Sequence, residues 1–313
     1  MSRSPRVVVV GSSNTDLVIK TQSIPRPGET VLGGSFLMAA GGKGANQAVA
    51  AARLGADVTF IARIGSDAFG DAARACLAAE GIRTEFIERE DQTASGVALI
   101  IVDEQAENAI AVAPGANSLL SANDVERAND TIRAADVLLL QLETPLDTVR
   151  HAARLAREAR VPVILNPAPA QPLDCALLED ITVLTPNRGE AAFLSGIEVG
   201  DEATARAAAN ALLEMGVAHV VITLGAEGAL WIGRGEGERE EDRVAGMAVE
   251  AIDTTAAGDA FNGALAAALG AGDSMREAVR FATVAGALAT TQMGAQPSLP
   301  TREAVEILNA RAQ

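Results

Sequence analysis

The sequence predicts a doubly wound α/β fold, in which a mostly parallel β-sheet is flanked by helices, together with a small β-sheet set apart. Two observations predict the main sheet: apolar runs alternate with amphipathic helical stretches, and each run is continuously hydrophobic, as in strands covered on both faces. The small sheet is predicted by two segments with short, alternating runs and no crossover helix. We expect residues 1–313 to form a single domain.

The first strand is predicted over residues 6–11, where four consecutive valines follow a short polar N-terminus. Later strands are predicted at 58–64, 137–141, 161–166, 182–185 and 220–224, and helices at 67–80, 124–135, 146–160 and 204–215. From Ala257 onward the pattern is that of several consecutive helices. Residues 233–243 are charged and contain glycine, so we expect an exposed loop without chemistry there.

The two segments that break the alternation are residues 16–39 and 96–113. Runs such as 16–19 and 97–102, and a turn at 104–108, favour antiparallel hairpins. No helical stretch is left to cover the second face of this sheet, and a large apolar face is unusual on a monomer. We therefore expect a lid that closes over a ligand and pairs with the same surface of a second copy, giving a homodimer. The alternative is that both segments pack on the main sheet as edge strands.

Composition limits the partners and the compartment. The formal charge of −16 disfavours nucleic acid and anionic membranes, because no basic cluster offsets it. No apolar run approaches the roughly 18 residues of a membrane helix, and the N-terminal run is too short for a signal peptide. Cys76 and Cys175 lie outside any metal-binding pattern and are expected to be buried, which fits a reducing cytoplasm. His151 and His219 are expected to be structural.

Residues 253–259, Asp-Thr-Thr-Ala-Ala-Gly-Asp, are the most informative stretch, because a turn of small residues leads directly into a helix. Small side chains let backbone N–H groups approach a ligand, and the N-terminal end of a helix attracts an anion such as phosphate. Asp259 is placed to take a proton from a hydroxyl that attacks this phosphate. Taken alone, such a turn more often indicates close helix packing than a phosphate site, and most aspartates in a first turn are helix caps.

A second glycine-rich element, Gly-Gly-Lys-Gly-Ala-Asn-Gln at 41–47, precedes an apolar helical run. Its Lys43 is one of two lysines in a chain that otherwise uses arginine, the other being Lys20. The patterns GxxxxGK[ST] and GxGxxG and the protein-kinase signatures are missing, so a phosphate cradle would be of another kind. Ligand sites of α/β sheets form at the carboxyl ends of strands. The residues of interest at these ends are Asn14, Asp16, Glu143, Asn187, Glu190, Thr223 and Gly225.

Together these residues resemble the phosphofructokinase-B-like carbohydrate kinase family over almost the full length of the chain. The resemblance is carried by stretches 41–48 and 253–259 and by the pattern Asn-x-x-Glu at Asn187 and Glu190. Stretches typical of the ribose-phosphorylating branch are 14–16, 141–143, 166–170 and 294–298. The chain departs from the family at Thr255, where isoleucine is common, and in the acidic loop near Gly233.

The resemblance implies ATP-dependent phosphorylation of D-ribose at O5. Asp259 would accept the O5 proton, and backbone N–H groups of Ala256, Ala257 and Gly258 would stabilise the transferred phosphate. The sugar hydroxyls would be held by Asn14, Asp16, Gly42, Lys43, Asn46 and Glu143. The ATP pocket would be lined by Asn187, Thr223, Gly225, Gly228, Gly258 and Thr283.

Two metal ions are also implied by the resemblance. Asn187 and Glu190 would hold Mg²⁺ through bound water, since Mg²⁺ gives up its waters reluctantly. An activating monovalent cation, K⁺, would lie beside the phosphate turn and hold its shape without touching the substrate. The cation would be surrounded, mostly through backbone carbonyls, by Asp253, Thr255, Ala289, Gln292, Gly294 and Ser298.

Other functions remain open at this point. A related kinase of the same fold could act on a nucleoside, on fructose or on a sugar acid. Asp16 and Glu143 argue against acidic sugars, and a nucleoside base would need an aromatic wall in a chain with 3% aromatic residues and no tyrosine. A non-catalytic sugar-binding regulator is disfavoured by the intact Asp259, and an NAD-dependent oxidoreductase by the missing glycine fingerprint.

Overall fold

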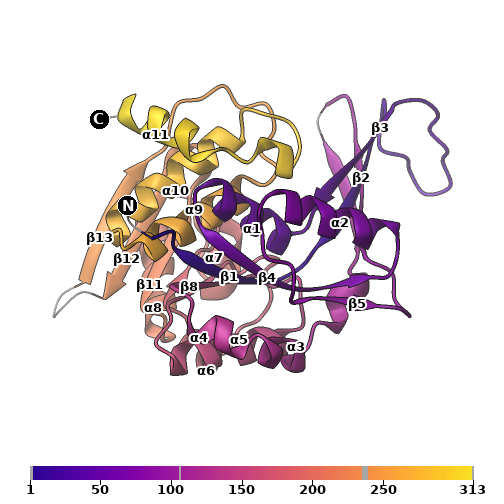
Figure 1. Cartoon of the computed structure of the whole chain (residues 1–313). Coiled ribbons are helices and arrows are strands. Elements are labelled where there is room, and N and C mark those ends of the chain that lie inside the picture. The colour runs from indigo at the N-terminus through magenta and orange to yellow at the C-terminus, as the bar shows by residue number, and fades with distance from the viewer. Residues whose placement is uncertain (1–2, 106, 235–238, 312–313) are drawn as a thin grey trace.

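The computed structural model describes residues 3–105, 107–234 and 239–311, and its main sheet has nine strands (Figure 1). They are β1 (Arg6–Val10), β4 (Asp57–Gly65), β5 (Ile87–Glu90), β8 (Val137–Leu140), β9 (Val163–Leu165), β10 (Val183–Leu184), β11 (His219–Thr223), β12 (Gly228–Arg234) and β13 (Arg239–Ala245). Their order across the sheet is β13-β12-β11-β10-β9-β8-β1-β4-β5. All neighbouring pairs from β11 to β5 are parallel, so the predicted doubly wound sheet is confirmed.

One edge of this sheet is an antiparallel hairpin, where the sequence pattern predicts a loop. β12 continues to Arg234 and pairs with β13 from Arg239 onward. The prediction of a loop over 233–243 is therefore wrong for these residues, and residues 235–238 lie outside the described part of the chain. Charged side chains are compatible with this position, because an edge strand exposes one side and charges on it discourage pairing with a further strand.

Helices cover both faces of the sheet (Figure 1). One face carries α1 (Lys43–Arg53), α2 (Ala68–Ala79), α9 (Ala257–Ala271), α10 (Met275–Ala289) and α11 (Arg302–Arg311). The other carries α3 (Ala122–Arg127), α4 (Asn129–Arg133), α5 (Leu146–Glu158), α6 (Cys175–Leu178), α7 (Arg188–Ser195) and α8 (Glu202–Glu214). The helix predicted over 124–135 is thus two short helices, because the backbone leaves the helical region at Ala128.

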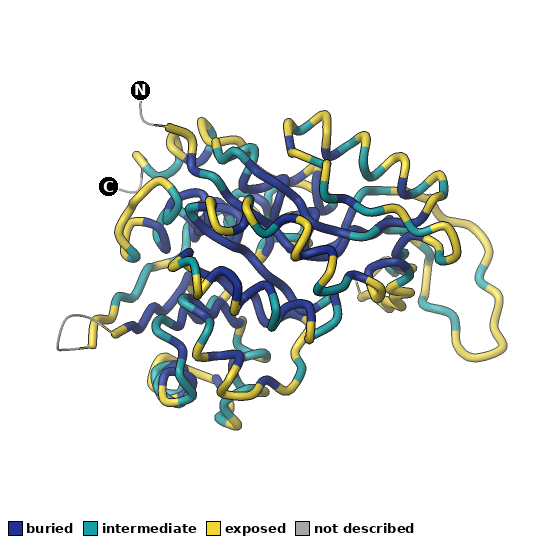
Figure 2. The backbone as a smooth tube through the Cα atoms, turned by 60° about the horizontal axis from the view of Figure 1, so that its bottom comes forward, coloured by how far each residue is buried: buried dark blue, intermediate teal, exposed yellow. Residues whose placement is uncertain are grey.

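Successive side chains of β1 point to opposite faces of the sheet, so this strand contributes to the hydrophobic core on each face. Val7 and Val9 pack on the face that α1 and α9 cover, whereas Val8 and Val10 pack on the face that α5 covers. All four valines are at most 2% exposed. In Figure 2 the buried segments, in dark blue, run through the middle of the molecule. Burial on both faces is the reason why the strand is apolar at every position.

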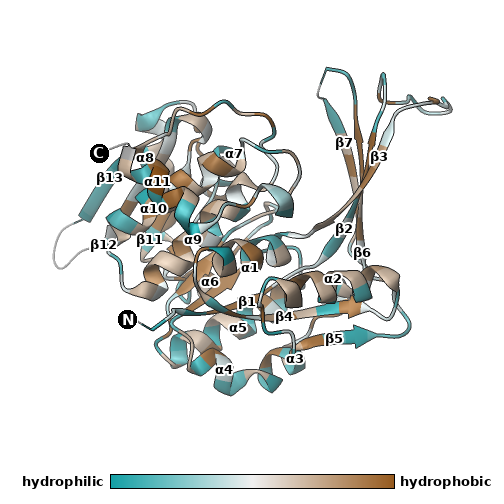
Figure 3. Ribbon diagram, turned by 45° about the horizontal axis from the view of Figure 1, so that its top comes forward, coloured by the Kyte–Doolittle hydropathy of each residue, from teal (hydrophilic) through white to brown (hydrophobic). Residues whose placement is uncertain are grey.

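The second sheet contains β2 (Asn14–Lys20), β3 (Ser35–Gly41), β6 (Gly96–Val102) and β7 (Asn108–Ala113), in the order β3-β2-β6-β7. It projects from the body of the molecule (Figures 1 and 3). The two outer pairs are antiparallel, as predicted, but the central pair β2–β6 is parallel, so the expectation of a purely antiparallel sheet is wrong. Neither segment joins the main sheet among the described residues, which removes the edge-strand alternative. Ala106, in the predicted turn at 104–108, lies outside the described residues.

The strands of this second sheet contain many hydrophobic residues, coloured brown in Figure 3. The strand register places Asp16 on one face, together with Leu37 and Ile110 farther out. The opposite face, which we call the outer face, contains Leu17, Ile19, Phe36, Met38, Leu99 and Ile101. Phe36 is 64% exposed and Leu99 is 54% exposed. Such a surface is unusual for an isolated chain.

The cysteines and histidines differ partly from expectation. Cys175 is exposed and Cys76 is half-buried, so the prediction that both are buried is wrong. His219 begins β11 and packs against the Trp231 ring, and burial lowers its pKa. None of the helices in the described part of the chain combines the length and the apolar character needed to cross a bilayer.

Candidate active site

The Asp259 carboxylate lies at the centre of the predicted site, in the first turn of α9, and is 7% exposed. Its Oδ2 accepts a hydrogen bond from Asn46 Nδ2 (2.9 Å) and its Oδ1 accepts one from Gln47 Nε2 (3.0 Å). Burial raises the pKa of Asp259, and the Lys43 ammonium and the two amide donors oppose that rise. The α1 and α9 helices thus bring together two motifs that lie more than two hundred residues apart in sequence.

The turn before α9 has the shape of an anion site. Ala256 caps the helix in the left-handed region (φ 59°), a conformation that costs a residue with a side chain about 1 kcal/mol or more. The N–H of Ala257 donates within the turn, to Thr254 O (3.3 Å). Among the described residues, the first-turn N–H groups of Gly258 and Asp259 have no acceptor. They are free for an anion at the helix N-terminus.

Two adjoining cavities lie on either side of this turn. The first, of about 210 Å³, has polar walls that include Lys43, Asn187, Glu190 and Asp259. The second, of about 270 Å³, is lined by the predicted Thr223, Gly225, Gly228, Gly258 and Thr283. Both cavities share Thr223, Thr254 and Gly258 in their walls.

The second cavity also has apolar walls, which the sequence pattern does not predict. They come from α9, α10 and the segment that follows β13, and include Met247, Val249, Ala251, Phe261 and Ala287. Such walls suit a flat heteroaromatic ring, with polar groups only at the edges. No motif marks these residues, because any small or apolar side chain can form such a wall.

The end of β8 and the start of β2 contribute further carboxylates. Glu143 Oε2 accepts hydrogen bonds from Ser12 Oγ (2.5 Å) and from the Lys43 N–H (3.0 Å). Asp16, on the inner face of the second sheet, has its pKa raised to about 6 by burial first, and then by the nearby Glu143 and Asp259. The main sheet and the second sheet therefore both supply carboxylates close to Asp259.

Lys43 is the cation of this pocket. Burial alone would lower the pKa of its ammonium, but the carboxylates of Asp259, Glu143 and Glu190 together raise it, so the ammonium stays protonated. The preceding Gly42 has φ 89°, and a Cβ there would lie 2.7 Å from Asn14 N. Only glycine lets the two strands of the second sheet and α1 meet this closely.

Asn14 and Asn46 have well-defined orientations. Asn14 Oδ1 accepts a hydrogen bond from Asn117 Nδ2 (2.8 Å), which leaves the Asn14 amide N–H groups for another partner. The Asn117 side chain also accepts a hydrogen bond from the Ser13 N–H and donates one to the Ser13 carbonyl oxygen. The sequence pattern does not single out Asn117. Asn46 Oδ1 is buried without a donor among the described residues. A ligand hydroxyl would meet both needs.

Asn187 and Glu190 begin α7 as a capping box. The Asn187 side chain accepts from the Glu190 N–H (2.9 Å), and Glu190 accepts from the Asn187 N–H (2.9 Å) and Nδ2 (2.8 Å). Burial raises the pKa of Glu190. Both residues line the polar cavity and retain free oxygen lone pairs, so they suit a hydrated hard cation more than a fully dehydrated one.

Asp253 joins the segments predicted to surround a monovalent cation. Its Oδ1 accepts from the Thr255 hydroxyl (2.6 Å) and its Oδ2 from the Gly294 N–H (2.8 Å), and these bonds outweigh burial and lower its pKa. Among the described residues, the carbonyl oxygens of Thr255, Ala289, Gln292 and Gly294 accept no hydrogen bond. Unpaired carbonyls beside a carboxylate fit a large, weakly hydrated cation. The Ser298 hydroxyl instead donates to Ala295 O.

Arg53, at the end of α1, clamps the neighbouring loop and was not singled out by the sequence. Its Nη1 donates to the carbonyl oxygens of Gln296 and Leu299 (2.8 Å each), while Glu80 holds the guanidinium from the other side (2.6 and 3.0 Å). Residues 295–299 are therefore fixed to the same helix that carries Lys43.

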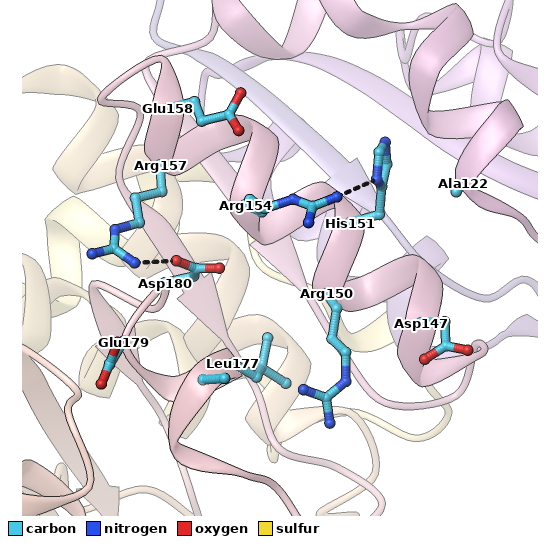
Figure 4. Close-up of a pocket in the computed structure, with 11 residues that line it drawn as sticks. Ala122, Asp147, Arg150, His151, Arg154, Arg157, Glu158, Leu177, Glu179 and Asp180 are labelled. Atoms are coloured by element: carbon cyan, nitrogen blue, oxygen red, sulfur yellow. Dashed lines mark hydrogen bonds and ion pairs between the residues drawn. The ribbon is translucent and has the colours of Figure 1, made fainter.

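A larger surface groove, of about 670 Å³, lies along α5, away from these residues (Figure 4). Its charged side chains carry both signs: Arg157 pairs with Asp180 within the groove, and Arg150 pairs with Asp174 beside it. Because its charges are mostly balanced and it shares no residue with the two cavities beside Asp259, we take Asp259 and its surroundings as the candidate active site.

Comparison with known proteins agrees with this geometry. The profile of the family described as "pfkB family carbohydrate kinase" matches residues 4–302, and the chain belongs to this family. A curated relative from Haemophilus influenzae, "Ribokinase", is 47% identical over 95% of this chain and 96% of its own length. A "Deoxyribokinase" from Salmonella typhimurium is 37% identical over 95% of this chain and 96% of its own.

Solved structures give the same result. A structure titled "Structure of Arabidopsis thaliana Ribokinase complexed with Ribose and ATP" superimposes with a TM-score of 0.88 at 32% identity, covering 99% of each chain. A Thermotoga maritima ribokinase superimposes with a TM-score of 0.88 at 37% identity, covering 98% of this chain and 99% of that one. These neighbours have the same main sheet and small projecting sheet that the sequence predicts.

Proposed function

We propose that this protein transfers the γ-phosphoryl group of ATP to O5 of D-ribose, giving D-ribose 5-phosphate and ADP. The observation that carries the proposal is the buried Asp259 at a helix N-terminus, which lines a polar cavity that adjoins a cavity with apolar walls. A sugar hydroxyl and a nucleotide phosphate placed in these two spaces would meet at this carboxylate. The full-length similarity to ribokinases from several organisms supports the same substrate pair.

The sugar would bind among the carboxylates and amides of the pocket. A polyol needs both donors and acceptors in fixed positions, and the pocket offers both. Asp16 and Glu143 would accept from hydroxyls, and the unpaired Asn46 Oδ1 would accept another. The predicted set of Asn14, Asp16, Gly42, Lys43, Asn46 and Glu143 is the set we assign to sugar binding.

In the reaction, Asp259 would accept the O5 proton as O5 forms its bond to the γ-phosphorus and the bond between that phosphorus and the β–γ bridging oxygen breaks. ADP would leave with the bridging oxygen and its electron pair. The free N–H groups at the start of α9 would stabilise negative charge on the transferring phosphoryl group, as would the Lys43 ammonium. Among the backbone groups of the predicted set, that of Gly258 is best placed, since the Ala257 N–H is engaged within the turn.

Two cations complete the proposal. Asn187 and Glu190 would hold the waters of a Mg²⁺ ion, which neutralises phosphate charge when bound. The carbonyl oxygens near Asp253 would surround K⁺ and keep the phosphate turn in its anion-binding shape. ATP would occupy the cavity lined by Thr223, Gly225, Gly228 and Thr283, with its base against the apolar wall.

We further propose that the second sheet is a lid and that two copies meet through it. Asp16, on β2 of this sheet, lies near Glu143 and Asp259, so movement of the sheet would admit and enclose the sugar and keep water from the phosphoryl group. The outer face would be buried against the same face of a partner, in the manner of a two-fold dimer. Leu99 and Ile101 both lie on this outer face, so substitution at either position probes the same surface. The site chemistry fits the predicted cytoplasmic location, where ATP is available.

The test is ADP release with purified protein, Mg²⁺, K⁺, ATP and a panel of acceptors: D-ribose, 2-deoxy-D-ribose, D-fructose, adenosine and inosine. We expect the highest kcat/KM with D-ribose. A preference for 2-deoxy-D-ribose is the second candidate, because relatives of that activity are also similar over the full chain. Asp259→Asn is the matched control for contaminating kinases. Sugar binding without ADP release from any acceptor would favour a non-catalytic regulator and contradict the proposal.

A further inference from the structure

Asp259 is held by a buried network of side-chain amides that the proposed reaction does not by itself require. Gln47 is fully buried, and its Nε2 donates to Asp259 Oδ1 (3.0 Å) and to Asn166 Oδ1 (3.1 Å). Its Oε1 accepts from Gln141 Nε2 (2.7 Å). The two N–H groups and the oxygen of the Gln47 amide therefore each have a partner. The three partners come from three different parts of the chain.

The orientation of the Gln47 amide is set by chemistry. If its N and O were exchanged, its oxygen would face the Asp259 carboxylate and the Asn166 oxygen, and its nitrogen would face the Gln141 nitrogen. Each contact would then be repulsive. Asn166 is in turn fixed, because its Nδ2 donates to Thr185 O (3.2 Å). The network therefore presents one particular N–H to Asp259 and cannot turn it away cheaply.

We propose that Gln47 is a positioning residue for the phosphoryl transfer: it fixes the Asp259 carboxylate and favours its ionised, proton-accepting form, with Gln141 and Asn166 keeping the Gln47 amide in place. This inference rests on the proposed function, in which Asp259 is the base. Asn46 donates to the other carboxylate oxygen but has its own oxygen free for a ligand, so its position is subject to the sugar. Gln47 lies one residue further into α1 and is shielded from the ligand.

The charged groups that face Asp259 come from four elements and are unchanged by substitution of Gln47. They are Lys43 on α1, Asp16 on β2, Glu143 after β8 and Glu190 on α7. Burial and the nearby negative charges raise the pKa of Asp259, and the hydrogen bond from Gln47 opposes that rise. Without this donor the pKa should be higher, so Asp259 should keep its proton to higher pH. A hydrogen bond to a charged group is strong enough to shift such a titration by about one pH unit.

The kinetic test compares wild type with Gln47→Met and Gln47→Glu. The acid limb of kcat is measured at saturating sugar, which removes the effect of protonation on sugar binding. Gln47→Met should move this limb upward by about one pH unit, and Gln47→Glu should move it further because it adds a second acid beside Asp259. Gln171→Met is the matched control, since Gln171 donates only to Leu142 O (3.2 Å) and should leave the limb in place. An unmoved limb with activity scaled down equally at every pH would overturn the proposal.

A second measurement needs no substrate. The shift in urea midpoint caused by Gln47→Met is determined in the wild-type and in the Asp259→Ala backgrounds. We expect a clearly smaller shift in the Asp259→Ala background, since the bond to the carboxylate is already lost there. Equal shifts in both backgrounds would overturn the coupling of Gln47 to Asp259. Should the protein phosphorylate no sugar, the proposed function fails, and this cycle still decides whether Gln47 holds the carboxylate.

Discussion

Replacement of Asp16 by asparagine should stabilise the protein without ligand while weakening its hold on the sugar. Asp16 has a raised pKa of about 6 because it is partly buried and lies near the Glu143 and Asp259 carboxylates. A carboxyl with a folded-state pKa above its unfolded value contributes stability that is fully present below the unfolded pKa. That contribution is lost as pH rises through the folded pKa. Asparagine cannot ionise, so Asp16→Asn removes this loss.

The magnitude follows from the two pKa values. A rise from 3.8 to about 6 corresponds to about 3 kcal/mol at neutral pH. Because Asp16 remains partly in contact with water, we expect about 1–2 kcal/mol of this to be measurable. The KM for D-ribose should rise about 10- to 100-fold, as a charge-assisted hydrogen bond to a hydroxyl is lost.

Urea denaturation of wild type and Asp16→Asn at pH 4 and at pH 7.5 measures the stability effect. The advantage of the variant should be near zero at pH 4 and should emerge between pH 4 and pH 7. In the wild type, the KM for D-ribose should also rise as pH falls below about 6, because the protonated carboxyl accepts fewer hydrogen bonds. A stability difference that is the same at both pH values would show that ionisation of Asp16 costs the fold nothing.

Three further results are expected. Asp259→Asn should fold and bind nucleotide but lose about 10²- to 10⁴-fold in kcat, as removal of a positioned general base does; near-wild-type turnover would take Asp259 out of the mechanism. KCl should activate more than NaCl or choline chloride at equal ionic strength, and equal rates in all three salts would contradict the cation site near Asp253. Leu99→Asp should convert a dimer to a monomer in light scattering, and a wild-type monomer at micromolar concentration would refute the lid interface.

The main sheet could be predicted because the hydrophobic pattern of each strand lies in consecutive residues. Val7 to Val10 are all apolar since both faces of β1 are covered, and a short run of β-branched residues favours a strand over a buried helix. The parallel β2–β6 pair could not be predicted, because it joins two hairpins that are separated by α1, β4, α2 and β5. Likewise, a charged, glycine-containing stretch reads as a loop unless its pairing with the neighbouring strand is known, as it is for β13.

The candidate site likewise contains some residues that the sequence predicts and others that it does not. Asp259 and Lys43 were found because short motifs surround them. Gln47, Asn117 and Arg53 act through partners that are far away in sequence, as in the bond from Gln47 to Asp259 and the bonds from Arg53 to Gln296 and Leu299. Gln47 belongs to the glycine-rich motif, yet nothing local distinguishes an amide that holds a carboxylate from one that caps a helix.

Helix α1 connects the residues around Asp259 mechanically to the loop that Arg53 holds. Its eleven residues span about 16 Å, from Lys43 and the amides that hold Asp259 to the Arg53 guanidinium that grips the carbonyls of residues 296 and 299. A packed helix of this length transmits displacement with little compression, so strain at one end reaches the other. If K⁺ tightens the loop near Gly294, the sugar should bind more firmly. By thermodynamic reciprocity, bound ribose should then raise the affinity for K⁺ by the same factor.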